Sequence, residues 1–188
     1  YLGVFLIVFV ESGVPIGIVL PLPGDTLLFS AGILAASSVF DLAPLLVVVI
    51  AGAILGDSVG YWFGAKYGPK LFTKEDALFL NKKHIERMNA FYKKFGRRAI
   101  ILARFIPMLR TLAPITAGMG QMHYGSFLSY NIAGAFIWGV SDTMHGYYLG
   151  THIPNIDHYL LPILGLIILA SSWSVVAEVL KARKEQKQ

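Results

Sequence analysis

Two arginines and two carboxylates stand in stretches of the sequence that are otherwise apolar. Arg104 and Arg110 lie within the segment 96–120, and Glu11 and Asp25 lie near the N-terminus. An arginine at the centre of a bilayer costs about 2.5–3.5 kcal/mol even on the most lenient experimental scale. A charge kept at this cost indicates a function, and the planar guanidinium group matches the oxygens of a phosphate.

Two interpretations of these four charges stay open from the residues alone. In the first, the arginines form structural ion pairs with Glu11 or Asp25, and Asp25 also caps the helix that starts at Thr26. In the second, Arg104 and Arg110 capture an anionic group while the carboxylates carry protons. Burial and a neighbouring arginine act in opposite directions on the proton affinity of a carboxylate, so the sequence does not decide between them. Both interpretations hold together if the pairs form at rest and exchange when a ligand binds.

Proline residues close to the charges predict broken helices. Pro107 and Pro114 interrupt the segment 97–121, because each proline removes a backbone donor and clashes with the preceding turn. Broken backbone at membrane depth survives only where protein buries it or where it lines a watery cavity. We therefore predict a re-entrant hairpin over 97–121, and another over about 10–36 with its broken tip at 21–25.

The composition places the chain among membrane proteins that cross the bilayer several times. Of its 188 residues, 55% are hydrophobic and 14% are charged, whereas charged residues usually make up about 25% of a soluble domain. The mean hydropathy is +0.62. Cysteine is absent, which excludes a disulfide framework and a thiol nucleophile. The chain opens on Tyr1 inside an apolar run, where we expect a trimmed or processed start rather than a signal peptide.

The placement of the positive charges indicates membrane orientation rather than nucleic-acid binding. Of the 16 Lys and Arg residues, ten lie in 66–98 and four lie in the C-terminal tail, so both regions are expected in the cytoplasm. The loops at 37–43 and 151–158 hold none and are expected outside. An even number of crossings must then separate the basic loop from the basic tail. This parity favours re-entry, rather than spanning, for 97–121.

The predicted fold is a single all-α membrane domain over 1–188, built as an inverted repeat with two opposed re-entrant hairpins. Spanning helices are expected at about 43–65, 123–150 and 157–181, with a basic amphipathic helix at 74–95 on the cytoplasmic surface. The domain divides into repeat 1 at about 10–68, a cytoplasmic amphipathic segment at about 70–96, repeat 2 at about 97–150 and a final transmembrane helix at about 157–181.

An internal repeat supports this arrangement, because short motifs of the first half recur in the second half at nearly constant spacing. The matching pairs are Asp25-Thr26-Leu27 with Arg110-Thr111-Leu112 and Asp57 with Asp142, each 85 residues apart, and Ala31-Gly32 with Ala117-Gly118, Gly60-Tyr61 with Gly146-Tyr147 and Gly64 with Gly150, each 86 apart. One spanning helix between the hairpins makes them enter from opposite faces. Many secondary transporters have this architecture, with the binding site at the midplane.

Other polar residues receive more modest interpretations. Asp57 and Asp142 sit near helix ends or small residues, and we favour packing and polar bonding for them. His123 and His145 are of a type that titrates near neutrality, but isolated histidines at membrane interfaces are more often structural. No cluster of His and carboxylate residues has the spacing of metal ligands, so no metal is expected. No nucleophile motif is present either, so we expect neither catalytic residues nor an enzyme.

Several motifs in combination resemble the DedA family of bacterial membrane proteins, the VTT or SNARE-associated type of lipid transporter. They cover about 10–150 and are Glu11, Pro23-Gly24-Asp25, Ala31-Gly32, Gly56-Asp57, Tyr61, Gly64, Arg104-Phe105-x-Pro107-x-x-Arg110-Thr111, Ala117-Gly118, Asn131, Gly134 and Trp138. The resemblance implies that the acidic pair and the arginine pair are functionally required. Asp25 is a departure, since many members have Glu there, but the charge is kept. The supporting polar candidates are Asp57, Thr111, Asn131 and Asp142.

The resemblance further implies a flippase for a polyprenyl phosphate, foremost undecaprenyl phosphate, in the bacterial plasma membrane and linked to the proton gradient. Arg104 and Arg110 would hold the phosphate, while Glu11 and Asp25 exchange protons. The expected partners are this or another anionic lipid, protons and membrane lipids, with no nucleic acid and no cofactor; a homodimer is left open. The alternatives are a phospholipid scramblase of broad specificity, a lipid phosphatase, and a structural or assembly protein. The phosphatase lacks a nucleophile beside a base, and four intramembrane charges are a costly feature for a purely structural protein.

Overall fold

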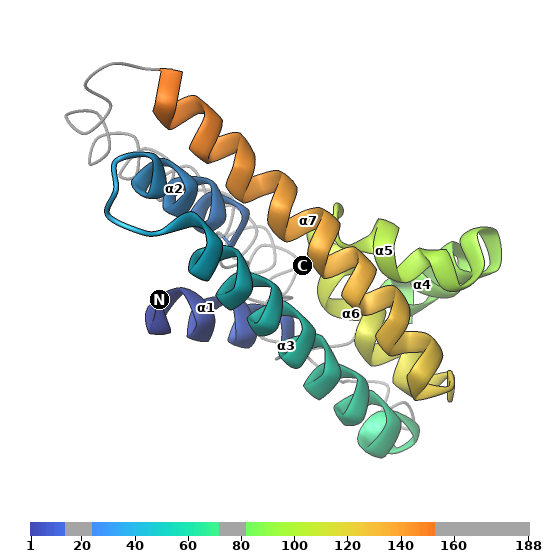
Figure 1. The fold of residues 1–188 in the computed structure, drawn as a ribbon. Helices are drawn as coiled ribbons and strands as arrows, with labels where there is room; N and C mark the ends of the chain where they lie inside the picture. Colours follow the sequence, from blue (N-terminus) through green and yellow to red (C-terminus); the bar gives the residue numbers. More distant parts are fainter. Residues whose placement is uncertain (14–23, 72–81, 153–188) are drawn as a thin grey trace, which may run out of the picture.

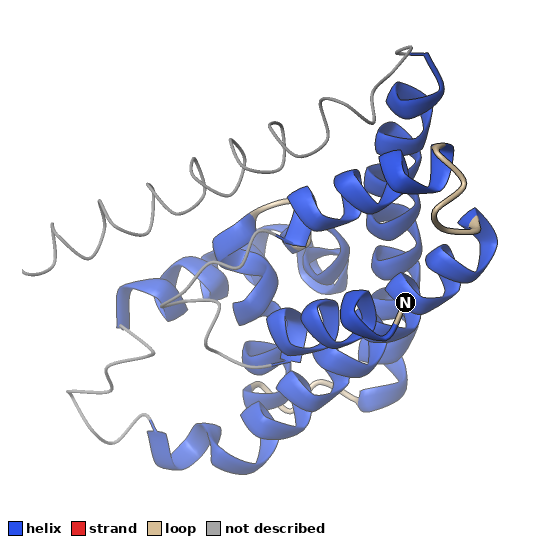
Figure 2. Ribbon diagram, turned by 90° about the vertical axis from the view of Figure 1, so that its left-hand side faces the viewer, coloured by secondary structure: helices blue, strands red, loops and turns tan. Residues whose placement is uncertain are grey.

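The structure of the chain is a computed structural model that describes residues 1–13, 24–71 and 82–152. Every regular element within these ranges is helical (Figures 1 and 2). The elements are α1 (Leu2–Gly13), α2 (Gly24–Ala36), α3 (Leu42–Leu71), α4 (Lys82–Phe95), a 3₁₀ turn (Gly96–Arg98), α5 (Ala99–Ala103), α6 (Pro107–Met119) and α7 (Tyr124–His152). The helices predicted over 43–65 and 123–150 are thus α3 and α7. The final helix predicted over 157–181 lies outside the described residues.

Two long helices, α3 and α7, run beside each other in opposite directions and carry the shorter ones (Figure 1). Their 30 and 29 residues correspond to about 45 Å of helix each, which exceeds the hydrocarbon thickness of a bilayer. The stretch Leu42–Gly68 of α3 is, among the described helices, the one both long and apolar enough to cross a membrane. Large apolar side chains such as Val47 and Phe136 are more than half exposed on these helices.

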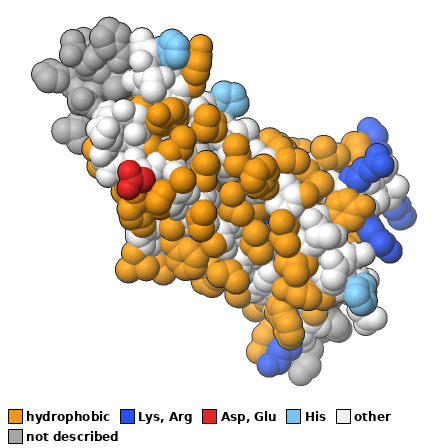
Figure 3. All heavy atoms as spheres, in the orientation of Figure 1, with side chains coloured by type: hydrophobic (Ala, Val, Ile, Leu, Met, Phe, Trp, Pro, Cys, Tyr) orange, Lys and Arg blue, Asp and Glu red, His pale blue; other side chains and the backbone are white. Residues whose placement is uncertain are grey.

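The surface of the molecule is divided by residue type. Figure 3 shows hydrophobic side chains over most of the visible face, whereas Lys and Arg side chains gather at the end where α4 and α5 lie. Lys93, Lys94, Arg97 and Arg98 are exposed at that end. A broad apolar belt with basic residues at one end is the pattern of a protein surrounded by lipid.

Glycines set how closely the short helices approach the long ones. In α2, a Cβ atom added at Gly32 would lie 2.1 Å from the carbonyl oxygen of Thr143 in α7. In α6, a Cβ atom added at Gly118 would lie 2.0 Å from the carbonyl oxygen of Tyr61 in α3. Since real Cβ atoms do not come so close, these backbones touch only because glycine occupies both positions.

The same contact pattern therefore occurs twice, α2 against α7 and α6 against α3. On the long helices, Gly146 meets the backbone of Phe29, and Gly64 meets that of Ile115 in the same way. The short helices correspond at a spacing of 86 residues, which is the spacing predicted from the sequence. The long helices correspond at 82, one helical turn less than the predicted 85 or 86. The predicted pairing of Asp57 with Asp142 and of Gly60 with Gly146 is therefore not the one these contacts follow.

The helix break predicted at Pro107 is present. Helix α5 ends at Ala103, Ile106 is extended (φ −119°, ψ 106°), and α6 starts at Pro107. The break predicted at Pro114 is wrong, because this proline lies inside α6. Beside it, the Thr116 hydroxyl donates to the carbonyl of residue 112 at 2.7 Å, and such side-chain bonds support backbone next to an intrahelical proline.

The first predicted hairpin, over about 10–36, is described only in part. Its tip at 21–25 falls mostly outside the described residues, and α2 begins at Gly24. Asp25 consequently stands in the first turn of α2, where a carboxylate faces the positive end of the helix dipole.

The basic helix α4 packs against the predicted second hairpin. Its Met88 is fully buried, and Phe91, Tyr92 and Phe95 pack with it against α6. The hydroxyl of Tyr92 donates a 2.9 Å hydrogen bond to the carbonyl of Ala113, and burial raises the pKa of this hydroxyl, so it stays a donor. The amphipathic helix predicted over 74–95 is confirmed from Lys82, while 72–81 lies outside the described residues.

Candidate functional site

Arg110 lies in the first turns of α6, four residues into the helix from the break, and forms ion pairs with two carboxylates. Its Nη2 atom pairs with Oε1 of Glu11 at the end of α1. Its Nη1 atom donates to Oδ1 of Asp25 at 2.5 Å. Glu11 is 4% exposed, whereas the side chain of Asp25 is 50% exposed. Three separate helices therefore meet at one guanidinium group, with one partner enclosed and the other open.

A glycine makes room for the buried carboxylate. A Cβ atom added at Gly24 would lie 1.9 Å from Oε2 of Glu11. The start of α2 therefore approaches Glu11 as closely as a backbone can, and any larger residue at position 24 would displace the carboxylate from Arg110.

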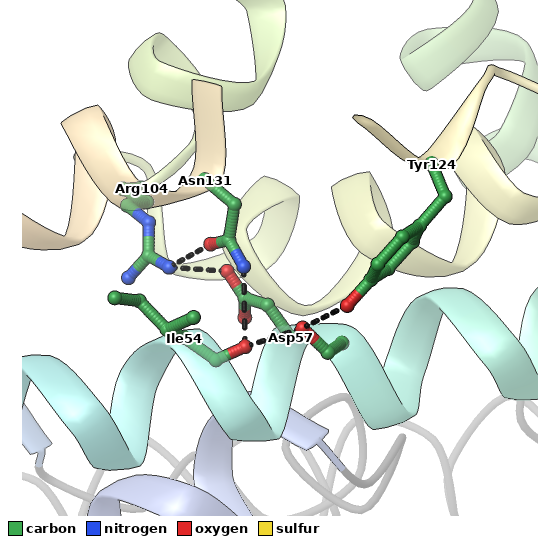
Figure 4. A network of polar contacts seen from close by, with 6 residues as sticks. Ile54, Asp57, Arg104, Tyr124 and Asn131 are labelled. Carbon is green, nitrogen blue, oxygen red and sulfur yellow. Dashed lines mark hydrogen bonds and ion pairs between the residues drawn. The ribbon is translucent and has the colours of Figure 1, made fainter. Parts of the chain in front are cut away.

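Arg104 closes the C-terminal end of α5 and belongs to a second group of polar residues (Figure 4). Its Nη2 atom pairs with Oδ2 of Asp57 in α3 and donates to Oδ1 of Asn131 in α7 at 2.5 Å. The Nδ2 atom of Asn131 in turn donates to the carbonyl of Ile54 at 3.2 Å. Arg104 and Asp57 are each 2% exposed, so this pair is enclosed. Gly134 admits the arginine stem, since a Cβ there would lie 2.9 Å from Cδ of Arg104.

Trp138 of α7 connects the two arginines. The Cζ atom of Arg110 lies 5.1 Å from the centre of the indole ring, and that of Arg104 lies 5.8 Å from it. Both distances are within the range of a cation–π interaction. The indole Nε1 donates to Oδ1 of Asp25 at 3.1 Å, so the tryptophan also holds one carboxylate. We refer to Glu11, Asp25, Asp57, Arg104, Arg110, Asn131 and Trp138 as the charged network.

Several buried donors of the network have no hydrogen-bond partner among the described residues. They are Nε and Nη1 of Arg104, Nε of Arg110 and the hydroxyl of Thr111, next to Arg110 in α6. Leaving a buried donor unpaired costs about 1–3 kcal/mol, and such groups are rare in protein interiors. Four of them around one tryptophan and its two arginines are a set of donors suited to an anion with several oxygens.

An open cavity of about 480 Å³ adjoins the network between α2 and α7. We call it the side cavity; it is lined by Asp25, Thr26, Phe29, Asp142 and His145. Asp25 is the residue that belongs to both, since it contacts Arg110 and Trp138 and also lines the cavity. Among the described residues, the side cavity is therefore an opening that adjoins the charged network through Asp25.

The sequence identified the charged residues but not all of their partners. Arg110 pairs with Glu11 and Asp25, as the ion-pair interpretation predicted. Arg104 pairs instead with Asp57, for which packing and polar bonding were favoured; the identity of its partner was not predicted, because no local signal links residues 47 positions apart. The predicted supporting residues are also placed: Asn131 contacts Arg104, Thr111 is buried beside Arg110, and Asp142 lines the side cavity.

Trp138 and His145 also belong to the site or line its cavity, although the sequence did not indicate this. The role of Trp138 as a platform for both arginines was missed, since a lone tryptophan in an apolar helix gives no signal of it. His145, interpreted as structural, lines the side cavity. In the described ranges no group of three His, Cys, Asp or Glu residues is arranged to hold a metal ion.

Comparisons with known proteins identify relatives of the chain. Residues 22–148 match the family model of the VTT domain. The chain is 42% identical to Protein DedA of Escherichia coli strain K12 over 174 residues, which cover 90% of the chain and 78% of that protein. It is 38% identical to an uncharacterised membrane protein of Mycobacterium tuberculosis over 194 residues, covering 99% of the chain and 82% of the relative. No solved structure matches the chain.

The family model spans α2 to most of α7, a range that includes every residue of the charged network except Glu11, and the matches to the two relatives extend over most of the chain. The mycobacterial relative is named as a membrane protein, in agreement with the apolar helix α3 and the apolar surface. The chain belongs to the DedA family of VTT-domain membrane proteins.

Proposed function

We propose that this protein moves a lipid phosphate across the membrane and that Arg104 and Arg110 bind the phosphate group. The observation that carries the proposal is the pair of buried guanidinium groups on one indole ring, with unpartnered donors on both. Buried arginines with spare donors match an anion that carries several oxygens. Transport needs no reacting side chain, so the network suffices without a nucleophile.

The two ion pairs of Arg110 suggest how an anion could enter. Glu11 is enclosed, but Asp25 is half exposed and lines the side cavity. An incoming phosphate can therefore replace Asp25 on Nη1 of Arg110 while Glu11 stays in place. Protonation of Asp25 would remove its charge and favour this exchange, which links phosphate binding to protons. Glu11 and Asp25 are accordingly the proposed proton carriers.

The substrate class follows from the surroundings of the network. Apolar side chains cover the outer surface of α3 and α7, so a lipid tail can remain in the bilayer while the headgroup occupies the site. Undecaprenyl phosphate is the substrate that the family resemblance suggests, in a bacterial plasma membrane that the chain crosses several times with its C-terminus in the cytoplasm. A phospholipid scramblase of broad specificity would use the same site with less discrimination.

The repeated glycine contacts support an inverted repeat with two re-entrant hairpins. Each short helix, α2 or α6, packs on the long helix of the other half. Such an exchange is expected when two halves are related by a two-fold axis. In transporters of this kind the site lies where the broken helices of both halves meet. Arg110 and Asp25 both lie near the starts of their helices, α6 and α2, and they contact each other.

Binding and transport of undecaprenyl phosphate test the proposal directly. Arg110→Ala should weaken binding about ten- to a hundredfold, since a hydrogen bond to a charged group contributes about 1.5–3 kcal/mol. Arg110→Lys should weaken it less, because lysine keeps the charge but not the planar fork. Binding is measured by native mass spectrometry, and transport in proteoliposomes with an ordinary phospholipid as competitor.

A surface arginine serves as the matched control. The Arg97 guanidinium bonds to Ser126 at 2.9 Å at the exposed end of the molecule, so Arg97→Ala should leave binding unchanged. Thermal unfolding of each variant separates loss of binding from loss of fold. Folded Arg104→Ala and Arg110→Ala proteins that bind the lipid phosphate as tightly as the unmodified protein would refute the proposal. Equal transport of an ordinary phospholipid would favour the scramblase.

A further inference from the structure

The side cavity has polar walls that do not suit the phosphate itself. Two of its five lining residues are carboxylates, Asp25 and Asp142, and a third is the imidazole of His145. Carboxylates repel an anion, so the lining selects for positive charge. The cavity nevertheless adjoins Arg110 through Asp25, which means that whatever enters it acts on the charged network.

Asp142 and His145 are placed to serve one path. They are three residues apart on α7, so their side chains emerge from the same face of the helix. Asp142 is partly buried and interacts electrostatically with Asp25 and Arg110 as well as with His145. His145 is exposed. His145 and the half-exposed Asp25 therefore both reach the open part of the side cavity, the partly buried Asp142 lines it with them, and Asp25 leads on to Arg110 and the buried Glu11.

The charges facing this path come from several helices. Asp25 faces it from α2, Arg110 from α6 and Glu11 lies behind Arg110 on α1. Arg104, at the end of α5, and Asp57 of α3 form a separate enclosed pair, and Arg104 also lies against Trp138. The path therefore ends at Asp25, whose carboxylate must lose its negative charge before it separates from Arg110.

We propose that the side cavity is a proton-access path, in which His145 and Asp142 pass protons from water to Asp25. This inference rests on the proposed function and adds two residues to it. A volume of about 480 Å³ holds several water molecules at about 30 Å³ each, so water can bridge the side chains. A proton from the aqueous phase moves to His145 or Asp142 and then to a carboxylate oxygen of Asp25, which loses its charge. Arg110 is then available to the phosphate, and the proton leaves when Asp25 pairs with Arg110 again.

A proton fits this site better than a metal cation. The described residues hold no group of three metal-ligating side chains, whereas an imidazole and a carboxylate together are suited to proton exchange. The path also lies on the appropriate half of the molecule. Asp142 is ten residues, about 15 Å, from the end of α7 at His152, and the loop after α2 lies at the same end (Figure 1). That end is expected outside, because its loops lack Lys and Arg.

Transport driven by a pH gradient, acidic outside, tests the proposal in proteoliposomes with undecaprenyl phosphate. Asp142→Asn and His145→Gln should each lower gradient-driven transport about tenfold, a conservative figure for loss of a positioned proton-transfer group. Asp142→Glu keeps a titratable carboxylate and should restore most of the rate with a shifted dependence on external pH. The matched controls are Asp41→Asn and His152→Gln, exposed groups outside the cavity lining that should leave the rate unchanged.

A second measurement needs no lipid phosphate. Because the chain lacks cysteine, Thr26→Cys places a single thiol in the side cavity. A membrane-impermeant cationic thiosulfonate added outside should modify it faster than an anionic one by a larger factor than the same two reagents show with a free thiol in solution, and Asp142→Asn should reduce this preference. A cavity that is closed from outside or prefers the anion would overturn the proposal. The labelling experiment tests the charge preference of the side cavity even if the protein proves not to transport undecaprenyl phosphate.

Two further outcomes of the transport measurement would also overturn the proton path. One is transport by Asp142→Asn and His145→Gln at the unmodified rate and pH profile while Asp25→Asn abolishes transport. The other is transport driven by a sodium gradient at constant pH. Failure of Arg110→Ala to impair binding would instead count against the phosphate site and leave the thiol result to decide on the cavity.

Discussion

At the scale of single residues, the enclosed pair of Arg104 and Asp57 is the most sensitive point of the network. Both side chains are 2% exposed, and Arg104 also holds Asn131. Removing one member of a buried pair leaves an uncompensated charge, which costs about 3–5 kcal/mol, whereas replacing both with apolar residues is often nearly neutral. The contribution of Arg104 and Asp57 to the stability of the fold therefore depends on both residues being present or both being replaced.

Asp57→Ala should consequently lower the free energy of unfolding by about 3–5 kcal/mol. The double variant Asp57→Leu with Arg104→Met should recover most of this loss while binding no lipid phosphate. Denaturant unfolding in detergent micelles measures both. Arg97→Ala, at the exposed surface, should change stability by no more than about 0.5 kcal/mol. A double variant as unstable as Asp57→Ala would show that the pair does not act as a unit.

Trp138 offers a second test at this scale, because its ring lies against both guanidinium groups. A cation–π contact contributes about 0.5–2 kcal/mol, so Trp138→Ala should weaken lipid-phosphate binding about tenfold. Trp138→Phe keeps an aromatic face and should retain most of the affinity. Trp62, which is 65% exposed, gives the control Trp62→Ala. Unchanged binding by Trp138→Ala would remove the tryptophan from the site.

Charge pattern predicted these residues only in part. Charged residues in apolar sequence identified Glu11, Asp25 and both arginines, since their cost in lipid is a physical signal. The pairing of Arg104 with Asp57 could not be predicted, because it depends on how α5 and α3 approach each other. Arg110, by contrast, pairs with Glu11 and Asp25, the two carboxylates that the ion-pair interpretation of the sequence proposed as partners.

At the scale of helices, proline and glycine decide the architecture in different ways. Pro107 starts α6, a position where its missing donor has no cost, so the sequence predicts the break correctly. Pro114 lies inside the same helix, where the hydroxyls of Tyr92 and Thr116 bond to neighbouring carbonyls. The error arose because the packing of α6 against α3 and α4, which encloses the helix around this proline, was not visible in the sequence.

The long-helix spacing was wrong for a related reason. The sequence aligned the two halves by identical residues. The backbone contacts in the structure align the long helices one helical turn away from that register. Glycine is common in this sequence, with 19 residues, so several registers offer a match. The contacts of Gly32 and Gly118 distinguish between these registers, because each glycine lies against the carbonyl of one residue in the facing long helix.

Substitution of these glycines tests the helix contacts. Gly32→Ala or Gly118→Ala places a Cβ atom about 2 Å from a carbonyl oxygen of the facing helix, so the helices must separate. Overpacking of this kind costs about 1–3 kcal/mol. Gly3→Ala is the matched control, since nothing lies within 4 Å of its added Cβ, and it should stabilise α1 by about 0.5–1 kcal/mol. Unfolding in micelles measures all three, and an unaffected Gly118→Ala protein would contradict the described packing.

At the scale of the whole molecule, the network, the side cavity and the basic end are arranged along one axis. The exposed Lys and Arg side chains gather at the α4 end, and the side cavity lies in the other half of α7 (Figure 3). The charged network occupies the region between them, at Asn131 to Trp138 of α7. A membrane around the apolar belt would thus place the arginines between the basic end, which we propose to be cytoplasmic, and the acidic side cavity, which we propose to open toward the outside.

The orientation of α3 in the membrane is the prediction on which this arrangement depends. Val39 precedes α3 and is 62% exposed, while Lys94 is exposed near the opposite end of the molecule. If α3 crosses the bilayer with its basic end inside, Val39→Cys should react with an impermeant maleimide in intact cells. Lys94→Cys should react only after permeabilisation. The unmodified chain, which has no cysteine, gives the background. Labelling of both positions from the same side would mean that α3 does not span, and the proposed path of protons from outside to Asp25 would then lose its direction.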